Sequence, residues 1–227
     1  MRMFHYDKRI RGKNLTKILQ IRKRNRIMEI AMFKKLFFAF TVLSLAACTA
    51  TPTFVPTLSA NQIDIEEQAV YVAVLQEKFS TSSFVIMDTT ATDPGGVENT
   101  AQTLDYVLQN MHDVAPETED SFRVRNDAAY SIRPNMDLGV EYVLLSQAEK
   151  NQIFGQNQSG WEIFYNHYPN APGITTLSRV GFNAALDQAL VYLGTQSDWL
   201  AGAGYYVLLK KANGVWTIDQ KVMTWIS

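Results

Sequence analysis

Three polar side chains in the C-terminal half of this 227-residue chain suggest a catalytic group. His167 has the side chain that most often acts as a general base near neutral pH, and Asp187 is the carboxylate that could orient it. Arg179 could hold a substrate carboxylate with its planar guanidinium. One hypothesis is therefore a small hydrolase or transferase that uses these three residues. The alternative for His167 is a structural histidine at or near the surface.

Arg179 also suggests a binding site in which no reaction takes place. It could recognise the carboxylate of a small ligand in a cleft lined by aromatic side chains that stand close together in the sequence. These are Trp161, Tyr165 and Tyr168. The alternative is a structural ion pair with Asp187 or Glu162, because an unpaired buried charge is costly.

The sequence predicts no metal site and no cofactor. The chain has one cysteine, and neither His112 nor His167 has a partner at the spacing of metal ligands. Residues 49–227 hold nine Lys and Arg against twenty Asp and Glu, a charge of −11. Since nucleic acids are bound by clustered basic residues, this acidic part argues against a nucleic-acid partner.

The first 47 residues have the opposite charge, with twelve Lys and Arg against two acids. Lys34 and Lys35 precede an apolar run over residues 36–47. Twelve residues are too few to cross a hydrocarbon core of about 30 Å as a helix. The basic start, the short apolar run and the small residues at its end are typical of a signal peptide.

The end of this run, Leu45-Ala46-Ala47-Cys48, resembles the lipobox of bacterial lipoproteins. The resemblance implies that a diacylglycerol is attached to Cys48 and that the residues before it are removed. Because Thr49 is not aspartate, it also implies sorting to the outer membrane, facing the periplasm, if the host has one. We therefore expect an extracytoplasmic protein whose partner is a membrane, bound through the N-terminal lipid. The alternative is a buried structural cysteine.

The chain is expected to have four parts. The first part, residues 1–31, is more basic than an ordinary signal-peptide start and lacks apolar periodicity. We therefore expect that translation begins at Met28 or Met32 rather than Met1. A segment rich in Thr and Pro stays extended and suits a tether. The parts are a mis-assigned or disordered extension (1–31), a lipoprotein signal peptide (32–47), the tether (48–60) and a single globular domain (61–227).

Apolar periodicity predicts helices in the first two thirds of the domain. Pro116 suits the first turn of a helix, and Ser146 with Glu149 has the pattern of a capping box. The expected helices are 62–79, one around 104–111, 116–126, one that starts at Ser146 and one that follows Gly160.

Residues with high strand propensity dominate the last third. Asn213-Gly214 is a strong hairpin signal, and Gly202 and Gly204 lie within the expected sheet, where glycine allows close packing or a bulge. The expected strands are 84–87, 141–145, 174–183, 188–194, 203–211 and 215–226. We therefore predict an α+β domain in which N-terminal helices pack on one face of a C-terminal four-stranded antiparallel meander.

The C-terminal third holds several motifs, at 168–173, 178–183, 188–192, 201–209 and 213–216, and residues 122–126 add a further one. Together they resemble an uncharacterised family of bacterial secreted and lipid-anchored proteins. The resemblance implies no activity. The sequence thus favours a lipid-anchored cell-envelope protein that binds a protein partner or a small ligand without catalysis. The alternatives are the enzyme described above and a structural or assembly lipoprotein whose sheet edge contacts another envelope protein.

Overall fold

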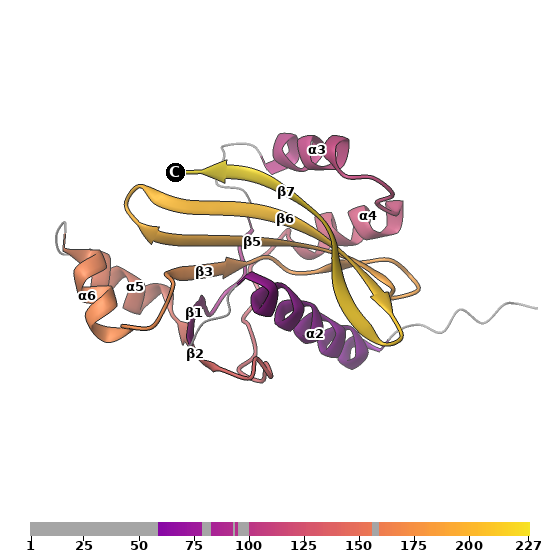
Figure 1. The fold of residues 1–227 in the computed structure, drawn as a ribbon. Coiled ribbons are helices and arrows are strands. Elements are labelled where there is room, and N and C mark those ends of the chain that lie inside the picture. The colour runs from indigo at the N-terminus through magenta and orange to yellow at the C-terminus, as the bar shows by residue number, and fades with distance from the viewer. Residues whose placement is uncertain (1–58, 79–82, 93, 95–99, 156–158) are drawn as a thin grey trace, which may run out of the picture. The chain divides into compact units, whose positions relative to one another are not determined.

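The computed structural model describes residues 59–78, 83–92, 94, 100–155 and 159–227 (Figure 1). They fall within the unit Thr57–Ser227. The predicted extension, the signal peptide with Cys48 and nearly all of the tether lie outside the described residues. In the part that is described, no helix has the length and apolar character needed to cross a membrane.

The predicted helices are confirmed, and local signals account for where they begin. Ser146 Oγ accepts a hydrogen bond from the Glu149 backbone N–H (3.2 Å), and the Glu149 carboxylate accepts one from the Ser146 N–H (2.9 Å). Pro116 occupies the first turn after Ala115. The helices are α2 (Ala60–Lys78), α3 (Thr100–Asn110), α4 (Pro116–Arg125), α5 (Gln147–Phe154) and α6 (Gly160–His167).

Within the described residues the strands form one mixed sheet of seven, so the α+β class is confirmed and the prediction of a four-stranded sheet is wrong. The strands are β1 (Ser83–Met87), β2 (Glu141–Leu145), β3 (Ile174–Leu177), β4 (Gly181–Phe182), β5 (Gln188–Asp198), β6 (Ala201–Ala212) and β7 (Val215–Ile226). The order is β2-β1-β3-β5-β6-β7, with β4 also paired to β5. β1 runs parallel to β2 and β3, and the other pairs are antiparallel. The two short strands β1 and β2 join the C-terminal strands through these parallel pairings. Sequence spacing does not reveal such pairings, because parallel strands are linked by long connections.

The predicted strand 174–183 is divided into β3 and β4. At the two residues before β4 the backbone N–H groups bond to side chains of α2 and of the residue after α4, instead of to a neighbouring strand. The Arg179 N–H donates to Asn126 Oδ1 (2.8 Å), and the Val180 N–H donates to Glu67 Oε1 (2.9 Å). These long-range contacts interrupt the strand at the position where Arg179 lies.

Helices cover both faces of the sheet, which corrects the prediction that they cover one (Figure 1). Along β5, Val191 and Leu193 pack in the core cluster that contains α2, whereas Leu190 and Tyr192 pack with residues of α3 and α4. The first eight residues of β5 are buried without interruption. Such a strand has an apolar run instead of alternation, because both of its faces are covered.

Glycines in the sheet permit close packing, as expected for Gly202 and Gly204. A Cβ atom on Gly204 would overlap the indole of Trp225 on the neighbouring strand. Gly181 has a similar role on β4. A Cβ atom there would lie 2.5–2.6 Å from Phe122 N and Cα, so α4 packs directly on the backbone of this strand.

Gly181→Ala should therefore lower the free energy of unfolding by about 1–3 kcal/mol, since α4 must move away from β4. Reduced backbone freedom in the unfolded chain works in the opposite direction but contributes only about 0.4–1 kcal/mol. Urea unfolding followed by circular dichroism measures the difference. An unchanged or higher midpoint would show that α4 moves away at no cost.

Candidate functional site

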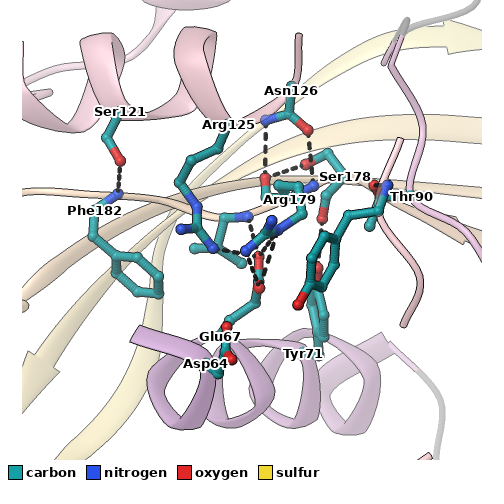
Figure 2. A network of polar contacts seen from close by, with 12 residues as sticks. Asp64, Glu67, Tyr71, Thr90, Ser121, Arg125, Asn126, Ser178, Arg179 and Phe182 are labelled. Carbon is teal, nitrogen blue, oxygen red and sulfur yellow. Dashed lines mark hydrogen bonds and ion pairs between the residues drawn. The ribbon is translucent and has the colours of Figure 1, made fainter. Parts of the chain in front are cut away.

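Arg179 forms a buried ion pair with Glu67 on α2 (Figure 2). Arg179 Nε lies 2.9 Å from Glu67 Oε1, and Nη2 lies 2.9 Å from Oε2, so the guanidinium binds the carboxylate with two parallel hydrogen bonds. Glu67 is only 3% exposed. The expectation of a structural ion pair agrees with this geometry, but the proposed partners Asp187 and Glu162 were wrong.

Among the described residues the Glu67 carboxylate has two further partners. Oε1 also accepts a hydrogen bond from the Val180 N–H (2.9 Å) and lies 3.0 Å from Nη2 of Arg125. The Arg125 contact is an ion pair without hydrogen-bond geometry, and among the described residues no acceptor is hydrogen-bonded to Nε or Nη2 of Arg125. Two guanidiniums therefore share one buried carboxylate, which has little capacity left to bind a substrate.

Two tyrosines and one asparagine complete the network. The Tyr130 ring lies 3.8 Å from the Arg179 guanidinium carbon, and the Tyr71 hydroxyl donates to the Ser178 carbonyl (2.9 Å). Asn126 Nδ2 donates to the Arg179 carbonyl (3.1 Å), while its Oδ1 accepts the Arg179 N–H. These contacts tie α2, α4 and the β3–β4 segment together (Figure 2).

Burial and the ion pair also change two pKa values in this network. Burial raises the pKa of the Tyr71 phenol well above its ordinary value, and the nearby Glu67 carboxylate raises it further. Burial acts to lower the pKa of Arg179, but its hydrogen bonds to Glu67 hold that pKa above the ordinary value. Arg179 is therefore always charged, and Tyr71 acts as a hydrogen-bond donor.

The aromatic residues expected to line a cleft with Arg179 lie elsewhere. Trp161, Tyr165 and Tyr168 belong to a cluster of rings around Phe164 that packs against β1. The Tyr165 hydroxyl donates to the Ser197 carbonyl (2.8 Å).

The alternation along β1 shows why this cluster does not meet Arg179. Val85 and Met87 pack with the rings of α6, whereas Phe84 and Ile86 pack in the cluster that contains α2. Arg179 binds Glu67 of α2, so the described side chains do not form the expected common cleft.

The weak catalytic candidates have local partners. His167 Nδ1 lies 2.8 Å from the Ile163 carbonyl one turn earlier in α6. Asp187 accepts a hydrogen bond from Asn183 Nδ2 (2.6 Å) in the turn before β5. The structure therefore does not pair His167 with Asp187. In the ranges described, His, Cys, Asp and Glu side chains form no group of three that could hold a metal ion.

No motif or spacing in the sequence predicts the cavity of about 150 Å³ that lies between α2 and the sheet. Its lining is formed by Val74 and Glu77 of α2, Leu193 of β5, Tyr205 and Val207 of β6, and Ile218 and Lys221 of β7. Glu77 and Lys221 form an ion pair (2.7 Å) with both side chains nearly half exposed, 47% and 42%. We therefore describe them as the mouth of the α2 cavity, and the aliphatic side chains as its wall.

The α2 cavity combines residues from four elements spread over 148 positions of the chain. Helical periodicity and strand propensity identify these elements but not an unfilled volume between them. The only related signal in the sequence is that the expected strands 188–194, 203–211 and 215–226 are rich in apolar residues, which helices packed on the sheet would cover.

Comparisons of the chain with protein-family models, with curated proteins and with solved structures gave no significant match. The resemblances described for Cys48 and for the C-terminal motifs therefore stay predictions. The geometry of the described residues is the basis for a functional argument.

Proposed function

We propose that this chain is a lipid-anchored protein of the bacterial cell envelope whose domain binds a small ligand in the α2 cavity without transforming it. The anchor is proposed from the basic leader, the short apolar run and Cys48. The observation that carries the binding function is the cavity of about 150 Å³.

The size and lining of the cavity limit the ligand. An aliphatic cavity of about 150 Å³ can hold one molecule the size of benzene. Val74, Leu193 and Val207 are almost fully buried and give the wall this character. Pockets for drug-sized ligands are several times larger, about 300–1,000 Å³. The ligand is therefore a small molecule, or the small apolar end of a larger one.

The chemistry of the wall favours binding over catalysis. The described residues that line the cavity offer an amine, a carboxylate and a phenol, from Lys221, Glu77 and Tyr205. A nucleophile needs an adjacent base and a third group that orients the base. His167 and Asp187, the candidates for such roles, contact Ile163 and Asn183 instead.

Filling the cavity should abolish binding while leaving the fold intact. We expect benzyl alcohol, added to the full-length protein in detergent, to shift the methyl NMR signals of Val74, Leu193, Val207 and Ile218 saturably. In Val74→Phe, benzyl alcohol should no longer shift the methyl signals of the other three residues saturably, because the added ring occupies the cavity. Ile218→Trp serves as a second filling variant on an edge strand, in case Val74→Phe unfolds the protein.

Val215→Phe is the matched control, because Val215 lies on the same strand as Ile218 but is 61% exposed. This variant should bind benzyl alcohol like the native chain. Saturable shifts that persist in both folded filling variants, or are absent from the native protein, would contradict the proposed site.

A further inference from the structure

We infer that the ligand of the α2 cavity is a small organic cation, a protonated amine or quaternary ammonium that carries one ring or a short alkyl chain. This inference rests on the proposed function and adds the charge of the ligand. The apolar part would occupy the aliphatic wall, and the cationic group would lie at the mouth beside Glu77.

The ion pair at the mouth can exchange partners at low cost. Glu77 Oε1 and Lys221 Nζ are 2.7 Å apart, but both side chains are nearly half exposed. Exposed pairs of this kind change an equilibrium constant by at most about fivefold, because water competes for both charges. A cationic ligand can therefore displace Lys221 from Glu77, and the released ammonium remains hydrated.

The position of Glu77 on α2 favours a cation over an anion. Glu77 lies in the last turn of α2, which ends at Lys78. The unpaired carbonyl groups of a helix C-terminus carry about half a negative charge, so a carboxylate there is unfavourable unless a cation is close. Both Glu77 and the helix end attract an ammonium group, and both repel a carboxylate.

Two further features act in the same direction. Tyr205 lines the cavity, and the faces of aromatic rings attract cations. Residues 49–227 carry a formal charge of −11, which raises the local concentration of cations and speeds their association. Among the described residues that line the cavity, Lys221 is the one basic side chain, and it is paired with Glu77.

Three probes that each contain one benzene ring but differ in charge show how much of the affinity comes from the charge and how much from the apolar ring. Benzylammonium, benzyl alcohol and benzoate are titrated into the full-length protein in detergent, with the methyl signals of Val74, Leu193, Val207 and Ile218 as the readout. We expect benzylammonium to bind about threefold to fivefold more tightly than either other probe, the difference that a contact with a partly exposed carboxylate supplies.

Variants at the mouth test the same contact. Glu77→Gln should weaken benzylammonium binding about threefold to fivefold and change benzyl alcohol binding less than twofold. Lys221→Gln should strengthen benzylammonium binding, because the competing amine is gone. Glu141→Gln, which removes an exposed carboxylate on β2, is the matched control and should bind all three probes like the native chain.

The outcomes distinguish the two proposals. If benzoate binds most tightly, if the three probes bind equally, or if Glu77→Gln leaves benzylammonium binding unchanged, the cation inference is overturned while the cavity remains a binding site. If no probe shifts the cavity methyl signals of the native protein, the inference and the proposed function both fail.

Discussion

Glu67→Ala should lower the free energy of unfolding by about 3–5 kcal/mol, the largest stability effect that we expect from a single side chain. The substitution leaves the guanidiniums of Arg179 and Arg125 largely buried without their shared carboxylate. It also removes the acceptor of the Val180 N–H, which lies in the interrupted segment between β3 and β4. Equilibrium urea unfolding, followed by circular dichroism and tryptophan fluorescence, measures the loss.

Two comparisons separate this effect from the general cost of an alanine substitution. Glu77→Ala breaks the exposed pair with Lys221 and should cost only about 0–1 kcal/mol. The triple variant Glu67→Met, Arg125→Leu and Arg179→Met should lose less stability than Glu67→Ala alone, because no unpaired charge stays buried. A loss under 1 kcal/mol for Glu67→Ala would mean that water reaches the two arginines and replaces the carboxylate.

Cys48→Ala should abolish stable membrane association, the largest effect that we expect on location. An acyl chain contributes about 0.8 kcal/mol for each buried methylene, and firm attachment takes two such chains or one with a second signal. Without the thiol, no thioether-linked diacylglycerol forms. The variant should therefore move from the detergent-rich phase to the aqueous phase in detergent phase separation, and its intact mass should lack the lipid.

Thr49→Ala is the matched control, because it changes the adjacent residue and keeps the thiol. This variant should stay in the detergent-rich phase. A native protein whose only cysteine is free, or a Cys48→Ala variant that remains as tightly membrane-bound as the native chain, would contradict the proposed anchor. The cavity experiments would stand in either case, since they concern the domain alone.

The helices and the last hairpin were correctly predicted because their signals lie within a few residues. Pro116 begins α4, and the capping box of Ser146 and Glu149 begins α5, as expected. Asn213 and Gly214 adopt the positive φ values, 53° and 83°, that a tight hairpin between β6 and β7 requires. In each case the stabilising contact joins neighbours in the chain, so the residue types alone determine the local conformation.

Only the tertiary structure decided how these elements combine. Val85 of β1 pairs with Ile174 of β3, and Arg179 finds its carboxylate 112 positions earlier, at Glu67. Sequence spacing cannot choose among the twenty acidic residues that follow residue 48, because the choice depends on which side chains the packed sheet and helices bring together. The α2 cavity has the same origin. Its residues are ordinary core-facing types, and the empty volume arises only from how α2 lies across three twisted strands.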